Sequence, residues 1–159
     1  MSRCSLLLLT VFYILSNYFG HSQKQEINWL NFEQLEEVFA IQPKKVFIYF
    51  NADWCVYCKK MDQTVFKKEP VITQMSIEFY AVKMNVESSD TIIFGGKQFV
   101  NKNFGEKRNS IHEIPLLLAS RKGKPFSLPA FVILDKNFKV SNRYFKYLSP
   151  KEMLKIITK

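Results

Sequence analysis

Three apolar segments divide the chain and predict the core strands of a buried sheet. They cover residues 46–50, 78–86 and 130–134. The first and third are continuously apolar, the pattern of strands that are covered on both faces. We therefore expect a central sheet with helices packed on either side of it.

Capping residues and helical spacing predict helices before, between and after these strands. Residues 31–34 have a capping-box pattern ahead of a helix that must end before Pro43. Residues 149–152 have the same pattern, with proline at the first helical position of a last helix. Apolar residues within 58–66 predict a helix after the first strand, which we expect Pro70 to kink or end.

The section at 88–125 has no single hydrophobic period. Glycines punctuate it, and we expect irregular structure around a short helix near 98–101. Apolar residues at helical spacing predict another helix within 110–120, kinked or starting late because of Pro115. We therefore predict a helical or irregular insertion ahead of the third core strand, which then enters a hairpin over 130–141.

The N-terminus has the pattern of a secretory signal peptide. Arg3 precedes an apolar run at 6–15, and small residues at the −3 and −1 positions place cleavage after about Ser22. The apolar run is shorter than the about 20 residues of a membrane-spanning helix, although an uncleaved anchor stays an alternative. We therefore divide the chain into a signal peptide, 1–22, and one exported domain, 23–159.

Composition restricts the function of this domain. The chain has 159 residues and a formal net charge of +9, but its lysines are scattered. No stacking or groove-reading motif accompanies them, so we expect a solvated surface and no nucleic-acid binding. Cys4 belongs to the predicted signal peptide, which leaves Cys55 and Cys58 as the cysteines of the exported domain. A single pair is not the framework of a disulfide-stapled mini-domain.

Cys55 and Cys58 lie between the first predicted strand and a helix. Residues three positions apart share one helix face, so the two thiols can form a disulfide and pass two electrons. Free N–H groups at the helix start stabilise a thiolate, the form of cysteine that attacks disulfides. An inert disulfide or half a zinc site is the alternative, but zinc needs four ligands and the domain adds only His112. We expect a redox-active pair, with no metal and no cofactor.

Residues 51–59 read Asn-Ala-Asp-Trp-Cys-Val-Tyr-Cys-Lys, a segment that resembles the active-site motif of the thioredoxin family. The resemblance covers about 30–158 and is nearest to thioredoxins exported by bacteria, including the C-terminal domain of the thiol:disulfide interchange protein DsbD. It implies an α/β thioredoxin fold, with a central mixed sheet, flanking helices and a cis-proline ahead of one core strand.

The resemblance also implies roles for individual residues. In the family the first cysteine attacks and the second resolves, which makes Cys55 the exposed nucleophile and Cys58 the more buried partner. Pro129 lies where the family has its cis-proline, and Leu128 would offer its backbone to an extended substrate. An ordinary trans-proline that begins a strand is the alternative. We expect Trp54 to border the reactive sulfur and to shape the docking surface.

One position departs from the family pattern. Many thioredoxins carry a buried aspartate six positions before the first cysteine, and it helps move protons to and from the resolving thiol. This chain has Tyr49 at that position and retains Lys83, a common family lysine, on the opposing strand. We expect proton transfer at Cys58 to rely on water, Lys83 or the Tyr49 hydroxyl.

These observations predict a thiol:disulfide oxidoreductase that acts on protein thiols and disulfides in the bacterial periplasm. Our first hypothesis is a reductant or electron carrier, fed by a membrane electron donor of the DsbD type. Disulfide oxidase or isomerase activity stays open, as does a non-catalytic binding or chaperone module with a structural disulfide. No dimerisation segment is visible, so we expect a monomer.

Overall fold

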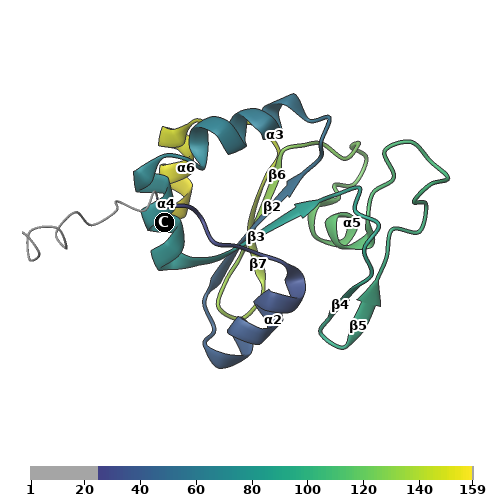
Figure 1. Cartoon of the computed structure of the whole chain (residues 1–159), viewed down its shortest axis with the longest axis horizontal. Helices are drawn as coiled ribbons and strands as arrows, with labels where there is room; N and C mark the ends of the chain where they lie inside the picture. The colour runs from purple at the N-terminus through teal and green to yellow at the C-terminus, as the bar shows by residue number, and fades with distance from the viewer. Residues whose placement is uncertain (1–24, 159) are drawn as a thin grey trace, which may run out of the picture.

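The computed structural model describes residues 25–158, and within them five strands form a mixed sheet in the order β1-β3-β2-β6-β7 (Figure 1). The parallel strands are β1 (Trp29–Leu30), β2 (Lys45–Asn51) and β3 (Phe79–Asn85). Strand β6 (Ala130–Leu134) runs antiparallel between β2 and β7 (Val140–Tyr144). The predicted signal peptide lies outside the described residues.

The three apolar segments of the sequence form the three central strands. Residues 46–50 of β2 are all buried, so both faces of this strand are covered, and β2 pairs with β3 on one edge and with β6 on the other. All five residues of β6 are buried as well. The prediction of a sheet covered on both faces is therefore confirmed.

Helices cover both faces of this sheet. Figure 1 shows α3 (Val56–Lys60), α4 (Glu69–Glu78) and α6 (Pro150–Ile157) together on one side, and α2 (Phe32–Ile41) and α5 (Glu113–Ala119) on the other. Both predicted capping boxes are present. Asn31 bonds with Gln34 ahead of α2, and Ser149 bonds with Glu152 ahead of α6.

The region around Pro70 differs from the prediction. Helix α3 continues as a π-helical turn, Met61–Val65, and the chain then starts a separate ten-residue helix, α4, at Glu69. Pro70 lies in the first turn of α4, where the N–H that proline lacks has no helical partner in any case. The proline therefore begins a helix and does not kink one.

The insertion contains a β-hairpin that the sequence did not predict. Strands β4 (Ile92–Phe94) and β5 (Lys97–Phe99) pair where we expected a short helix near 98–101, so that expectation is wrong. Gly95 and Gly96 both have positive φ, at 60° and 69°, which closes a tight turn between the strands. The later helix, α5, is present and starts late at Glu113, as predicted.

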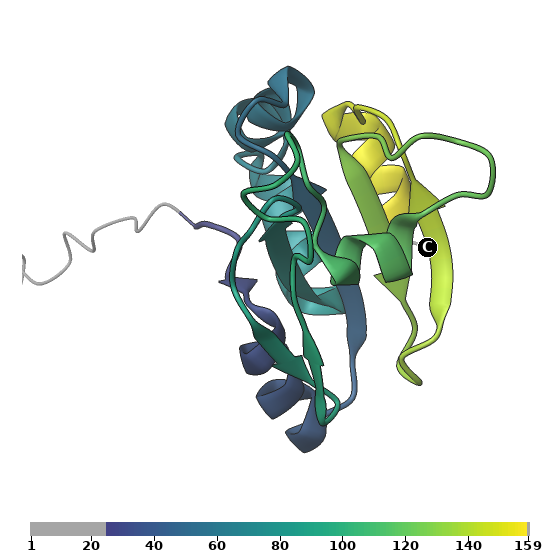
Figure 2. The ribbon, with the colours of Figure 1, turned by 90° about the vertical axis from the view of Figure 1, so that its right-hand side faces the viewer.

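The first part of the insertion, up to residue 111, leaves the sheet and returns to it at one place. The backbone N–H of His112 donates to the carbonyl oxygen of Val86 at 2.8 Å. The side-chain amide of Asn101 donates to the carbonyl oxygens of Ser88 and Ser110, at 3.3 and 3.1 Å. Figure 2 shows the excursion between these ends in front of the sheet, with α5 completing it. Among the described residues, no helix has the length and apolar character to cross a membrane.

Candidate redox site

Strand β2 delivers the chain to the cysteines. After Asn51 the chain makes a turn in which the N–H of Cys55 donates to the carbonyl oxygen of Ala52 at 3.0 Å. Cys55 then serves as the N-cap of α3, and its Sγ accepts a hydrogen bond from the N–H of Cys58 at 3.2 Å. Cys55 and Cys58 form a disulfide with their Cα atoms 5.2 Å apart.

Both cysteines are buried in this oxidised state. Cys55 is 4% exposed and Cys58 is 1% exposed, so the expected order of burial holds but Cys55 is not the exposed residue that we predicted. The reason is that the Cys55 side chain turns inward, to bond with Cys58 and to accept its N–H. The surface beside them comes from neighbouring side chains, since Trp54 and Tyr57 are 54% and 59% exposed.

Trp54 is held in place by the loop that follows β3. Its indole Nε1 donates to Oε1 of Glu87 at 2.8 Å. The amide of Asn85 donates to Oδ1 of Asp53 at 3.2 Å, and the N–H of Val86 donates to the carbonyl oxygen of Asn51 at 2.8 Å. The active-site loop is therefore fastened to the β3 loop at three points. Sequence reasoning missed Glu87, because no local pattern pairs residues 33 positions apart.

The structure places Pro129 beside the redox loop. Ala130, the first residue of β6, pairs with Phe50, so the preceding residues lie next to the end of β2 that leads to the cysteines. The Leu128–Pro129 peptide bond is cis, as expected from the family. Pro129 is buried and Leu128 is half-buried.

Arg121 anchors the loop that leads to Pro129. Its Nη2 atom donates to Oγ of Ser127 at 2.6 Å and to the carbonyl oxygen of Pro125 at 3.4 Å. Its guanidinium also lies 4.0 Å from the ring centroid of Phe145, between β7 and α6. These three contacts fix the segment just before Leu128. The sequence offered no signal for them.

Tyr49 lies under the redox helix. Its side chain is fully buried, and its hydroxyl donates to the carbonyl oxygen of Cys58 at 3.1 Å. Burial raises the pKa of Tyr49 far above its usual value, and the negative charge of Asp62 adds to this effect. The Tyr49 hydroxyl therefore keeps its proton at neutral pH.

Lys83 is paired with a carboxylate that the sequence analysis did not single out. Its Nζ atom lies 2.9 Å from Oδ1 of Asp62 and 5.5 Å from the ring centroid of Tyr49. Asp62 and Lys83 line a cavity of about 190 Å³ together with Trp29 and Phe66. The ion pair thus lies at one side of the aromatic layer beneath α3.

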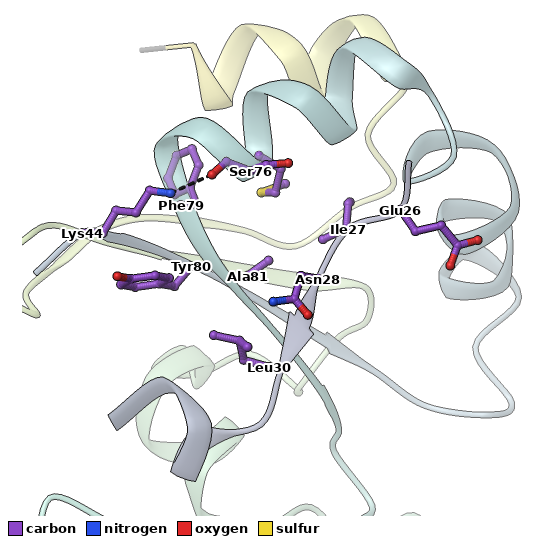
Figure 3. A pocket seen from close by; sticks show the side chains of 10 residues that line it. Glu26, Ile27, Asn28, Leu30, Lys44, Ser76, Phe79, Tyr80 and Ala81 are labelled. Atoms are coloured by element: carbon purple, nitrogen blue, oxygen red, sulfur yellow. Dashed lines mark hydrogen bonds between the residues drawn. The ribbon is translucent and has the colours of Figure 1, made fainter. Parts of the chain in front are cut away.

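A second cavity, of about 260 Å³, contains none of the predicted site residues. It lies beside the N-terminal segment and β3, and Figure 3 shows Lys44 reaching the carbonyl oxygen of Ser76, at 2.7 Å. The Nζ atom of Lys44 also lies 5.4 Å from the ring centroid of Tyr80. Burial lowers the pKa of Lys44, with Glu78 partly opposing this effect. Lys44 therefore links the start of β2 to α4.

Histidine 112 has a structural role. It is fully buried, its Nε2 lies 3.1 Å from the carbonyl oxygen of Asp90, and its Nδ1 accepts the N–H of Ile114 at 3.2 Å. Both ring nitrogens are therefore engaged, Nδ1 in capping α5 and Nε2 with the loop that precedes β4. Across residues 25–158, no three histidine, cysteine or acidic side chains are grouped so that they could hold a metal ion.

Comparison with known proteins finds a matching protein family and a curated relative. A family model described as a thioredoxin-like domain matches residues 32–159. The thiol:disulfide interchange protein DsbD of Campylobacter jejuni is 32% identical over 60 residues, which cover 38% of this chain and 10% of that protein. The match thus spans about a tenth of the length of the curated relative.

Solved structures share the fold at low sequence identity. A thioredoxin from Thermus thermophilus superimposes with a TM-score of 0.59 at 18% identity, covering 84% of this chain and 85% of its own. The C-terminal domain of DsbD from Neisseria meningitidis, in the reduced form, gives a TM-score of 0.51 at 14% identity, with coverage of 79% and 90%. Both have the same arrangement of a central sheet and flanking helices.

Proposed function

Because this chain belongs to the thioredoxin-like family, we propose that it is an exported thiol:disulfide oxidoreductase that reduces protein disulfides or carries electrons to them. The observation that carries the proposal is the Cys55–Cys58 disulfide at the start of α3. A strand, a turn and a helix start hold the two sulfurs within bonding distance, so the pair can open and close with little change of the backbone.

The reaction begins from the reduced protein. The thiolate of Cys55 attacks one sulfur of a substrate disulfide, forms a mixed disulfide and releases the other substrate sulfur as a thiolate, which takes up a proton. The thiolate of Cys58 then attacks the Cys55 sulfur and releases the second substrate thiol. The substrate gains two electrons and two protons, and the protein is left with the Cys55–Cys58 disulfide.

Three features support Cys55 as the attacking residue. It precedes Cys58 at the N-cap of α3, it is the less buried of the two, and the Cys58 N–H points at its sulfur. In the reduced protein that N–H and the start of the helix would stabilise negative charge on Cys55.

Substrate would bind between the redox loop and the residues that lead into β6. The register of β2 and β6 supports this placement, because it sets the residues before Ala130 beside the end of β2. Leu128 would pair its backbone with an extended substrate segment next to Pro129, as an added strand. Trp54 would cover the bound segment.

Proton handling at Cys58 involves Tyr49 and Lys83 in this proposal. Tyr49 supports it through a direct hydrogen bond to the Cys58 backbone, and Lys83 through its position over the Tyr49 ring. Because the Tyr49 hydroxyl keeps its proton and donates a hydrogen bond to the Cys58 carbonyl, its part is to position the backbone of Cys58, and the proton itself would pass through Lys83 or water. Water near the Asp62–Lys83 pair would then exchange the proton.

The location and the electron donor are also part of the proposal. Residues 1–22 have the order of basic, apolar and small residues of a signal peptide, which supports a periplasmic domain at 23–159. The partial match to DsbD supports a membrane electron donor of that type. We propose a monomer that works on other proteins.

The decisive measurement is the equilibrium reduction potential of the cysteine pair, titrated against thiol buffers of known potential. A value at or below about −230 mV supports a reductant, whereas a value between about −120 and −180 mV points to an oxidase or isomerase. A pair that never cycles contradicts the enzyme and favours a binding module.

A trapping experiment identifies the roles of the two cysteines. The Cys58→Ser variant should accumulate mixed disulfides between Cys55 and substrate proteins, because the resolving thiol is gone. The matched Cys55→Ser variant should accumulate far fewer. Equal trapping by the two variants would contradict the assignment of Cys55 as nucleophile.

A further inference from the structure

Two tyrosine rings and a lysine form one surface next to the redox pair. Tyr57, which lies between the cysteines, has its ring centroid 6.2 Å from that of Tyr147, in the segment between β7 and α6. The Nζ atom of Lys60 lies 4.8 Å from the ring centroid of Tyr147. We call Tyr57, Lys60 and Tyr147 the tyrosine platform.

The charge around the tyrosine platform is positive. Lys59 and Lys60 are both exposed in the first turns of α3, and the N–H of Lys59 donates to the carbonyl oxygen of Cys55 at 3.0 Å. Lys146 is paired with Glu152, whose carboxylate also accepts hydrogen bonds from Ser149, so the positive charge here comes from Lys59 and Lys60.

The opposite flank of the redox pair is acidic. Asp53 accepts a hydrogen bond from Asn85, and Glu87 accepts one from the indole of Trp54. Both hydrogen-bond donors are neutral groups, so neither carboxylate is paired with a cation in these contacts. The redox pair thus lies between the tyrosine platform with Lys60 on the α6 side and an acidic flank on the β3 side, and the exposed Lys59 lies on the same helix.

We propose that the tyrosine platform and Lys59 select partner proteins in which acidic residues, with an apolar or aromatic side chain, flank the reacting cysteine. This inference rests on the proposed function. A carboxylate on the partner would meet Lys59 and Lys60, and an apolar side chain would pack on Tyr57. A nucleic acid would also meet the charge, but it brings no thiol or disulfide to Cys55.

The selection acts on binding and not on the bond exchange. Exposed charges on either side of the redox pair attract or repel the partner as it approaches. They favour one orientation of its chain across the two flanks. A basic flank on the partner would meet like charge on the α6 side. Because exposed ion pairs are screened, the preference must weaken as salt is added.

The test uses three disulfide peptides that differ only in the residues flanking one cysteine, which are Glu-Glu, Gln-Gln or Lys-Lys. The reduced full chain should reduce them with kcat/KM in the order acidic, neutral, basic. We expect about a tenfold range at low salt, the size expected of two or three exposed ion pairs, and most of it in KM. In 0.5 M salt, where the Debye length falls to about 4 Å, the range should shrink to about threefold or less.

Charge reversal gives the sharper result. The Lys59→Glu and Lys60→Glu double variant should invert the order of the acidic and basic peptides. The matched control is the double variant Lys136→Glu and Lys139→Glu, in exposed residues near the β6–β7 turn at the far end of the sheet. It makes the same change of charge and should leave the order unchanged.

The outcomes separate this inference from the proposed function. Equal reduction of all three peptides, or a preference for the basic one, overturns the acidic-partner inference and leaves the oxidoreductase intact. Inversion by the control variant overturns it too, because net charge alone would then explain the order. Failure to reduce any peptide contradicts the proposed function, and the inference falls with it.

Discussion

The hydroxyl of Tyr49 and the backbone of Cys58 are joined by a hydrogen bond of 3.1 Å, which links the central strand to the redox helix. Tyr49 is buried among aromatic side chains, with its ring centroid 5.3 Å from that of Phe131 and 5.0 Å from that of Phe66. The carbonyl of the resolving cysteine is thus held from beneath by a residue of β2. This contact gives Tyr49 a measurable part in the stability of the site.

The first prediction concerns Tyr49→Phe, which removes only the hydroxyl. We expect the free energy of unfolding of the oxidised protein to fall by about 1 kcal/mol, the usual contribution of one hydrogen bond. Urea unfolding at pH 7 measures it. An unchanged free energy of unfolding would show that the carbonyl is equally well satisfied without Tyr49.

The raised pKa of Tyr49 predicts that the stability of the protein depends on pH in the alkaline range. The pKa of Tyr49 is raised above its unfolded value of 10.0, so its stabilising effect is complete below pH 10 and is lost as the pH rises further. The native protein should therefore lose stability more steeply above pH 10 than Tyr49→Phe does. Parallel curves for the two proteins between pH 9 and 11 would contradict this prediction.

The Trp54–Glu87 contact predicts an effect on substrate binding. Glu87→Ala removes the acceptor of the indole N–H, and we expect KM for peptide disulfides to rise about fivefold, equivalent to about 1 kcal/mol. Glu87→Gln keeps an acceptor and should lie close to the native protein. Steady-state kinetics separate KM from kcat, and a fall in kcat alone would place Glu87 in the bond exchange.

The contacts of Arg121 predict that it positions the loop before Pro129. Arg121→Lys keeps the charge but loses the guanidinium that lies over Phe145 and the two hydrogen bonds from Nη2 to the loop. We expect KM for peptide disulfides to rise severalfold, with the reduction potential of the cysteine pair unchanged. Lys122→Ala removes an exposed cation one residue along and is the matched control. A rise of the same size in the control would rule out a specific role for Arg121.

The lowered pKa of Glu152 predicts that the stability of the protein depends on pH in the acid range. Hydrogen bonds from the Ser149 backbone and hydroxyl, and then from Lys146, lower the pKa of Glu152 from 4.5 to about 2. The stabilising effect is therefore complete above pH 4.5 and is lost as the pH falls through about 2. Glu152→Gln should weaken the native protein at pH 7 and show less additional loss between pH 4.5 and pH 2. Urea unfolding at a series of acid pH values tests this. An equal loss of the free energy of unfolding in the two proteins between pH 4.5 and pH 2 would contradict the prediction.

Local sequence patterns predicted much of the fold because the relevant interactions are local. The capping residues Asn31 and Ser149 contact partners three positions away, and continuous apolar runs identify strands that are covered on both faces. Prediction from local sequence patterns failed for residues 92–99. The Gly95–Gly96 turn was visible, but each flanking strand has three residues, which is too few to show the period of a strand.

The parts of the site that sequence reasoning missed are contacts across long separations. Asp62 meets Lys83 only because the π-helical turn and β3 are packed together, and neither segment alone indicates it. Glu87 and Arg121 are similar cases. Their roles depend on which loops meet at one end of the sheet.

The paired ends of the insertion have a consequence for how this chain can vary. Val86 and His112 are bonded to each other, so the 25 intervening residues leave the sheet and return to it at one place. The excursion is also held to α2, because the N–H groups of Ile93 and Gly95 donate to the carboxylates of Glu33 and Glu36. Its exposed part, residues 104–109, has neither these contacts nor the Trp54–Glu87 bond. A fluorescent label or a short foreign loop placed there would report on partners while the cysteines keep their geometry.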